Sequence, residues 1–393
     1  MKTGPGMCTK LLTGEAFARA LVTWQQSHGR QHLPWQHTGD AYKVWLSEIM
    51  LQQTQVSTVL AYYARFLEAF PTVADLAAAS EETVMHLWAG LGYYSRARNL
   101  HACARQVVAQ YGGQFPRTVN ELQSLPGIGR STAGAIASLA HGVQAPILDG
   151  NVKRVFCRYY AVDGNPEQSA VQNQLWQIAT ANVPSERAGQ YNQALMDLGA
   201  TCCTPKKPNC KACPLMQSCE ALRMGMVDLL PTPKPKKPRP NLHFVALIVR
   251  TPAGGLGMRM QKEKGVWFKL WTPPLAVWEP AGGVPALQAQ CLAWVAEFGL
   301  DAHHAQQLHK QCETLLTQAW LVHELTHRKM HFRVLTLEVP SNALLPGLAL
   351  ALPTELPVPK IVHKLLMHAD GVCVSGADGA VANQDTLDFG QGI

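Results

Sequence analysis

Two acidic residues stand where a carboxyl group could act as an acid or as an electrostatic stabiliser. Glu48 lies inside the apolar segment VWLSEIML. On a largely apolar helix its charged form is disfavoured by desolvation, which raises its pKa toward the range that a general acid needs near neutral pH. Asp149 follows an apolar run and precedes Gly150 and Asn151, which predicts a turn. Each residue also has a simpler interpretation, as the solvent face of an amphipathic helix for Glu48 and as the N-cap of a helix over 151–160 for Asp149.

A glycine-rich turn precedes Asp149 by about twenty residues. The segment LPGIGRSTAGAIASLA, residues 125–140, places Gly127 and Gly129 in a tight turn and then opens a helix with a small, polar first turn. Such a turn lets the backbone approach a phosphate closely, and the helix N-terminus adds a favourable dipole. The pattern therefore favours a phosphate contact, and the alternative is an ordinary packing corner between two helices.

Four cysteines cluster in a loop rich in lysine and proline. They have six, two and five residues between them and are Cys203, Cys210, Cys213 and Cys219. Such a loop cannot build its own core, so we expect the four thiolates to share a metal; ligand type alone admits structural zinc or an iron–sulfur cluster. Cys202 directly precedes Cys203 and is not counted in this spacing. The other cysteines show no such grouping and are interpreted as buried or incidental thiols: Cys8, Cys103, Cys157, Cys291, Cys312 and Cys373.

The bulk composition narrows the class of protein. A chain of 393 residues exceeds the size of one hydrophobic core, which predicts two domains. The excess of 34 basic over 27 acidic residues weakly favours a polyanionic partner. No apolar run is long enough for a membrane span, and the first residues do not resemble a secretory signal. We therefore expect a cytoplasmic protein.

A proline- and lysine-rich segment divides the chain. The sequence PTPKPKKPRP precludes regular helix or central strand, which predicts a linker over 231–241. Residues 1–230 read as mainly α, with helices over 15–26, 42–53 and 132–142. Residues 242–367 read as α+β, with strands over 243–250 and 331–339 and a helical stretch from 285 to 299. The tail from 368 to 393 is expected to be disordered.

Several motifs together resemble a known family. LPGIGRSTAG, ILDGNVKRV and the cysteine spacing are similar to the helix–hairpin–helix DNA glycosylases that carry one [4Fe-4S] cluster. SEIMLQQTQV, GLGYYSRARNL and NQALMDLGA resemble the MutY-type adenine DNA glycosylases within that superfamily. The resemblance spans roughly residues 15–225. It implies a monomeric base-excision repair enzyme that binds duplex DNA and releases adenine mispaired with 8-oxoguanine or guanine.

The resemblance also implies roles for individual residues. Glu48 falls on the family's general acid, and Asp149 falls on the carboxylate that stabilises the oxocarbenium-like sugar, as in paired-carboxylate glycoside hydrolysis. The adenine must first leave the base stack. Family positions that wedge or hold the opened duplex fall on Gln53, Thr54, Leu91 and Tyr93. Pocket or catalytic-support positions fall on Arg30, Trp35, Asn151 and Gln193.

The position after the hairpin bears on the type of reaction. Endonuclease III-like relatives carry a Schiff-base lysine where this chain has Ser131, and they lack an acid matching Glu48. The resemblance therefore implies base removal without strand cleavage. Lys153 could still give slight cleavage, but a contact with a DNA phosphate or a structural contact is its simpler role. The alternatives are an endonuclease III-like glycosylase with lyase activity and a non-enzymatic DNA-binding protein.

Residues 242–367 resemble, more weakly, the Nudix-like domain that reads 8-oxoguanine in these enzymes. GVWFKLWTPPL, residues 265–275, matches best, but the acidic run that a Nudix hydrolase needs for magnesium is reduced to Glu297, so pyrophosphatase activity is not expected. The family's Phe-Ser-His loop is replaced by Leu325-Thr326-His327. The replacement implies that hydrogen bonding to the oxidised base is kept while aromatic stacking is lost; the alternative is a plain surface loop.

Overall fold

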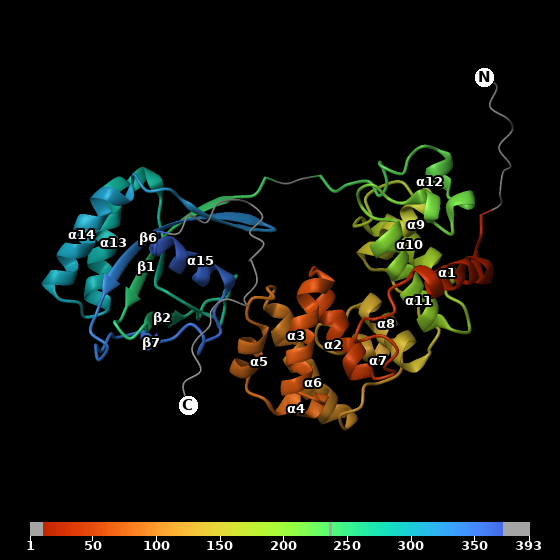
Figure 1. The fold of residues 1–393 in the computed structure, drawn as a ribbon, viewed down its shortest axis with the longest axis horizontal. Coiled ribbons are helices and arrows are strands. Elements are labelled where there is room, and N and C mark those ends of the chain that lie inside the picture. The colour runs from red at the N-terminus through yellow and green to blue at the C-terminus, as the bar shows by residue number, and fades with distance from the viewer. Residues whose placement is uncertain (1–10, 236–237, 372–393) are drawn as a thin grey trace, which may run out of the picture. The chain divides into compact units, whose positions relative to one another are not determined.

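The computed structural model describes residues 11–235 and 238–371, which form two compact units (Figure 1). The first unit is helical throughout. Its helices are α1 (Gly14–His28), α2 (Ala41–Leu51), α3 (Val56–Ala69), α4 (Val73–Ala78), α5 (Glu81–Trp88), α6 (Ser95–Tyr111), α7 (Val119–Gln123), α8 (Arg130–His141), α9 (Gly150–Tyr159), α10 (Ser169–Asn182), α11 (Ala188–Asp197) and α12 (Glu220–Arg223). The helices predicted around 15–26, 42–53 and 132–142 are confirmed as α1, α2 and α8.

Helix α2 carries Glu48 and is capped at its N-terminus. The Asp40 side chain caps its N-terminus by accepting hydrogen bonds from the backbone N–H groups of Tyr42 and Lys43. Such caps stabilise a helix by about 1 kcal/mol because they satisfy otherwise unpaired N–H groups. The helix ends at Leu51, two residues before the predicted boundary, and residues 52–54 form a turn.

The core between α1, α9 and α11 of the first unit is aromatic. Phe17 of α1 packs against Tyr159 of α9, with ring centroids 5.0 Å apart, and against Tyr191 of α11. All three side chains are almost fully buried. Burial of side chains this large contributes about 2 kcal/mol or more each, so this core fixes α1, α9 and α11 relative to one another.

The second unit is built on one mixed sheet. Its strands are β1 (Asn241–Arg250), β2 (Leu256–Met260), β3 (Trp271–Thr272), β4 (Leu275–Val277), β5 (Leu321–Leu325), β6 (Arg328–Glu338) and β7 (Ala349–Ala351), and its helices are α13 (Gly283–Glu297), α14 (Ala302–Leu315) and α15 (Lys360–Ala369). The main strand order is β3-β2-β1-β6-β5, with β1 and β6 parallel. The strands predicted at 243–250 and 331–339 are confirmed as β1 and β6, and the predicted helical stretch from 285 as α13.

Helices cover both faces of this sheet. Buried residues of α13 and α14, such as Trp294 and Leu308, join Leu247 of β1 and Leu335 of β6 in one core. Figure 1 shows α13 and α14 side by side, with α15 apart from them. Helix α15 extends to Ala369, so the tail predicted from residue 368 begins inside a helix; its remaining residues, 372–393, lie outside the described residues. No helix in the described part of the chain has the length and apolar character to cross a bilayer.

Candidate active site

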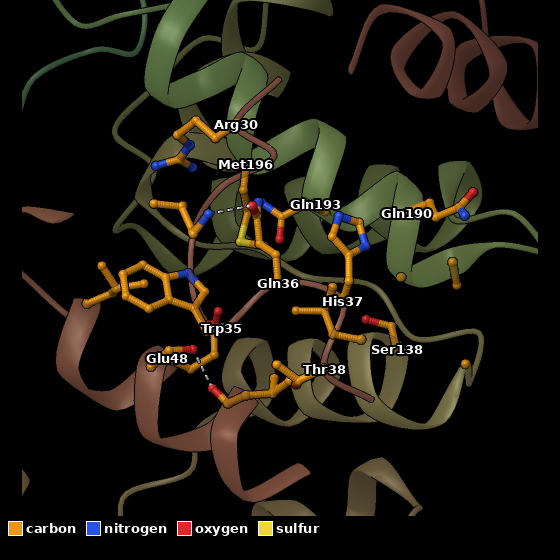
Figure 2. Close-up of a pocket in the computed structure, with 18 of the residues that line it drawn as sticks. Arg30, Trp35, Gln36, His37, Thr38, Glu48, Ser138, Gln190, Gln193 and Met196 are labelled. Atoms are coloured by element: carbon orange, nitrogen blue, oxygen red, sulfur yellow. Dashed lines mark hydrogen bonds between the residues drawn. The ribbon is translucent and has the colours of Figure 1, made fainter. Parts of the chain in front are cut away.

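A pocket of about 290 Å³ opens between α2, α11, the end of α8 and the loop after α1. Four residues predicted from the sequence line it: Arg30, Trp35, Glu48 and Gln193. Figure 2 shows their side chains around one hollow, although Arg30 and Gln193 come from segments more than 160 residues apart. Asp149 and Asn151 do not line this pocket.

Glu48 is half-buried in the pocket wall, which contradicts its alternative placement on a solvent-exposed helix face. Burial raises the pKa of its carboxyl group to about 7, and repulsion from Asp149 acts in the same direction. The two carboxyl groups are thus close enough to repel each other electrostatically. At neutral pH a substantial share of Glu48 is therefore protonated and able to donate a proton.

Asp149 is the N-cap of α9, which confirms the simpler of the two interpretations of its sequence; its catalytic role stays a prediction. Its Oδ1 accepts a hydrogen bond of 2.8 Å from the backbone N–H of Val152, so it is the N-cap of α9. Burial raises the pKa of its carboxyl group, while hydrogen bonds from the backbone N–H groups of Val152 and Asn151 oppose that rise. The cap thus holds the carboxylate in a fixed orientation beside Glu48.

Ser131 is the first residue of interest after the hairpin. Its Oγ accepts a hydrogen bond of 2.9 Å from the backbone N–H of Leu148, the residue before Asp149. The hydroxyl thereby ties the first turn of α8 to the segment that carries Asp149. Ser131 thus holds backbone in place, and its expected role as a DNA-binding residue stays a prediction.

Asn151 is held by a residue that the sequence analysis did not single out. Arg154 donates from Nη2 to Asn151 Oδ1 at 2.8 Å and to the carbonyl oxygen of Gly199 at 2.6 Å. Its Nε donates to the carbonyl oxygen of Cys203 at 2.8 Å. Arg154 therefore connects the start of α9 to the cysteine loop.

Asp197 is a second residue that the sequence analysis missed. Its Oδ1 accepts hydrogen bonds from Arg30 Nε at 2.8 Å and from Gln193 Nε2 at 3.1 Å, and its Oδ2 accepts one from the backbone N–H of Arg30 at 3.1 Å. Its side chain is fully buried. The only sequence signal was its place in NQALMDLGA, four residues after Gln193 on the same helix face.

The hairpin has the geometry expected of a close backbone approach. Gly127 has a φ of 77°, and a Cβ there would lie 2.8 Å from the Cβ of Asn99, so a larger residue is strained on both counts. Gly129 caps α8, and a Cβ there would meet nothing within 4 Å. Both glycines are exposed, so the N-terminus of α8 is open to a ligand.

The four predicted wedge positions differ in exposure. Gln53 is exposed with a φ of 57°, and Tyr93 is 44% exposed with a φ of 49°. Thr54 is half-buried, and Leu91 is buried. Positive φ in two residues other than glycine marks backbone strain at this predicted DNA-facing edge.

Lys153 is engaged in an ion pair. Its Nζ lies 2.7 Å from Glu167 Oε1, and the lysine side chain is only 15% exposed. The lysine lowers the pKa of the Glu167 carboxyl group by hydrogen bonding and by charge. The amine that sequence analysis considered as an occasional nucleophile is thus held by a carboxylate.

The four clustered cysteines line one small, largely apolar pocket, which Cys202 also lines. Arg158 reaches it, donating from Nη1 to Cys203 Sγ at 3.4 Å. Among the described residues, no three His, Cys, Asp or Glu side chains are grouped closely enough to hold a metal ion. Of the remaining cysteines, Cys103, Cys157, Cys291 and Cys312 are buried, whereas Cys8 and Cys373 lie outside the described residues.

Thr326 and His327 form the two-residue turn between β5 and β6, and both are exposed. Leu325 is the last residue of β5 and is half-buried. The segment is therefore the tip of a hairpin that projects a hydroxyl group and an imidazole.

Comparison with known proteins defines the class of this fold and site. Residues 46–181 match the HhH-GPD superfamily of base excision DNA repair proteins. The chain is 36% identical over 392 residues to the adenine DNA glycosylase of Homo sapiens, covering 84% of this chain and 69% of that protein. It is 32% identical over 329 residues to the adenine DNA glycosylase of Buchnera aphidicola subsp. Acyrthosiphon pisum, covering 84% of this chain and 88% of that protein. A solved thermostable thymine-DNA glycosylase is 30% identical and covers 53% of this chain and 95% of its own, with a TM-score of 0.49.

The chain belongs to the adenine DNA glycosylases. It is therefore a DNA-binding hydrolase of base-excision repair that cleaves the N-glycosidic bond of adenine. The alternatives of a pyrimidine-specific lyase and of a non-enzymatic DNA-binding protein are set aside.

Proposed function

We propose that this enzyme releases adenine paired with 8-oxoguanine or guanine and leaves the DNA backbone uncut. The observation that carries the proposal is the pair of carboxyl groups, with Glu48 half-protonated near neutral pH in the pocket wall and Asp149 beside it. Arg30, Trp35 and Gln193, which line the same pocket, are the groups available to bind the extruded base.

The two carboxyl groups take different steps of the reaction. Protonated Glu48 donates its proton to a ring nitrogen of the adenine, so that the base departs neutral as the glycosidic bond breaks. The Asp149 carboxylate, fixed by the α9 backbone, stabilises the positive charge that develops on the sugar. The Glu48 carboxylate then accepts a proton from the attacking water, which restores the acid. Asn151, held by Arg154, supports the same region.

Two observations support base removal without strand cleavage. Ser131 offers no amine, and its hydroxyl is engaged with the backbone of Leu148. Lys153 is held in its ion pair with Glu167. A Schiff base at the sugar needs a free amine, which neither residue presents.

For the second unit we propose a Nudix-like role in recognising the lesion opposite the adenine. Its mixed sheet between helices is compatible with that family, and the exposed Thr326-His327 turn offers hydrogen-bonding groups without an aromatic wedge. We expect Thr326→Ala with His327→Ala to lower the preference for A:8-oxoguanine over A:G and to leave cleavage of A:G nearly unchanged. An unaltered preference would refute the role.

We further propose that Cys203, Cys210, Cys213 and Cys219 hold one [4Fe-4S] cluster. Four thiols lining one apolar pocket suit an iron–sulfur cluster. The Arg158 guanidinium donates a hydrogen bond to Cys203 Sγ at the edge of this pocket. Such a cluster would brace the loop that α9 contacts through Arg154. A brown purified protein with iron and sulfide in equal amounts is the expected result; stoichiometric zinc would overturn it.

The main test uses purified protein and duplexes that contain A:8-oxoguanine, A:G, A:C or thymine glycol. We expect adenine release from the first two and strand breaks only after alkali. Glu48→Gln should abolish release while duplex binding, measured by gel shift, persists. Strand breaks before alkali, or undiminished release by Glu48→Gln, would exclude the proposed mechanism. Sedimentation of the protein–DNA complex tests the expected monomer.

A further inference from the structure

Arg96, in the first turn of α6, is a buried cation that the proposed chemistry does not use. Its side chain is 8% exposed, and burial lowers the pKa of its guanidinium to about 10, so it stays charged at neutral pH. A buried charge is costly unless it is hydrogen-bonded, so its partners indicate what it is for.

The partners of Arg96 lie at the end of the helix that carries Glu48. Its Nη1 donates to the carbonyl oxygens of Ile49 and Met50, both at 2.9 Å. The last carbonyl groups of a helix lack intrahelical partners, so this guanidinium satisfies them and complements the helix dipole.

Arg96 also forms hydrogen bonds with the turn that follows α2. Nη1 donates to the carbonyl oxygen of Gln52 at 2.6 Å, and Nη2 donates to Thr54 Oγ1 at 3.1 Å. These two contacts lie on either side of Gln53, whose φ of 57° is unfavourable for a residue other than glycine. Such a conformation persists only where the surroundings impose it, and Arg96 binds the backbone before it and the side chain after it.

Arg96 also contacts Tyr93. The guanidinium carbon of Arg96 lies 5.3 Å from the centre of the Tyr93 ring, and the backbone N–H of Arg96 donates to the Tyr93 carbonyl oxygen at 2.8 Å. Tyr93 is exposed and also has a positive φ. One side chain thus contacts both strained segments at the predicted DNA-facing edge.

We propose that Arg96 is a positioning residue for opening the duplex: it holds Gln53 and Tyr93 in the strained conformations that engage DNA. The proposal rests on the proposed DNA-contacting role of these two residues. Arg96 is not among the residues that line the pocket, so we expect its effect to fall on extrusion of adenine rather than on cleavage of the glycosidic bond. Glycosylases must supply the unstacking free energy, and a base without a pairing partner needs less of it.

The test compares two duplexes in single-turnover reactions of the full-length protein. One holds adenine opposite 8-oxoguanine, and the other holds adenine opposite an abasic-site analogue, where no pair must be broken. We expect Arg96→Gln to slow release from the paired duplex by roughly tenfold or more, and from the unpaired one by less than about threefold. The pH midpoint of the unpaired reaction should match that of the unaltered protein, because Glu48 is undisturbed.

Two further proteins complete the design. Arg105→Gln, an exposed position on the same helix, should behave as the unaltered protein on both duplexes. Arg96→Lys keeps the charge but loses the forked hydrogen bonds, so its rate on the paired duplex should lie between those of Arg96→Gln and the unaltered protein. If Arg96→Gln unfolds, Arg96→Lys carries the test and should slow the paired reaction more than the unpaired one. An equal loss on both duplexes, or no loss on the paired one, would overturn the proposal. Failure of the unaltered protein to release adenine from either duplex would instead refute the proposed function.

Discussion

Arg30 is held at the pocket by Asp197, whose Oδ1 lies 2.7 Å from Arg30 Nη2 and 2.8 Å from Arg30 Nε. The carboxylate is fully buried, whereas Arg30 keeps 23% of its side chain exposed toward solvent and pocket. Gln193 donates to the same carboxylate oxygen. Two of the four predicted residues lining the pocket therefore depend on one buried charge for their placement.

Replacing Asp197 with Asn keeps the shape of the side chain and removes its charge. Because the loss of one partner leaves a buried cationic contact uncompensated, we expect a loss of about 3 kcal/mol in the free energy of unfolding. Adenine release should slow by roughly tenfold or more, since Arg30 and Gln193 lose their common anchor. Urea unfolding and single-turnover kinetics measure the two effects. The exposed Glu68→Gln is the control; an Asp197→Asn enzyme as active and stable as that control would contradict the prediction.

The pH dependence of adenine release should report Glu48. The reaction needs the protonated carboxyl group, and the pKa of that group is raised to about 7. The single-turnover rate should therefore fall as the pH rises through about 7, by roughly tenfold per pH unit on the alkaline side. Rates measured from pH 5.5 to 9 on an A:G duplex test this. A rate that stays level to pH 9 would show that Glu48 is not the acid.

Glu48 should also lower stability at alkaline pH. In the folded protein the pKa of Glu48 is about 7, whereas in the unfolded chain it has its ordinary value of 4.5. Stability attributable to this residue is thus present below pH 4.5 and is lost as the pH rises through 7. Since Glu48 is only half-buried, we expect Glu48→Gln to be more stable than the unaltered protein by about 1 kcal/mol at pH 8, and equally stable near pH 4.5. Urea unfolding of both proteins at pH 8 and pH 4.5 measures this difference. A Glu48→Gln protein that is less stable than the unaltered protein at pH 8 would contradict the prediction.

Some features of the site were predictable because they depend on local sequence. The glycine turn, the N-cap at Asp149 and the helices α2 and α8 each follow from residues within one segment. Apolar neighbours of Glu48 correctly indicated desolvation, since a helix with apolar residues on most sides must bury its one carboxyl group.

Other features depended on contacts between distant segments. Asp197 accepts a hydrogen bond from Arg30, which lies 167 residues earlier in the sequence. Arg96 donates to carbonyl groups of residues that lie 44 to 47 positions before it. No single motif shows which of several charged residues will be buried, because burial is decided by packing of the whole unit.

The ion pair of Lys153 with Glu167 should keep residual strand cleavage low. Formation of a Schiff base requires a free amine, and the Lys153 amine is held 2.7 Å from the Glu167 carboxylate. Glu167→Gln should therefore raise the fraction of enzyme trapped on abasic DNA by borohydride, roughly threefold or more, while adenine release changes little. Lys153→Ala alone, or combined with Glu167→Gln, should abolish the trapped product, which identifies the amine. Glu186→Gln, at an exposed position, serves as the control. Trapping that does not respond to Glu167, or that persists without Lys153, would mean that another amine is responsible for the cleavage.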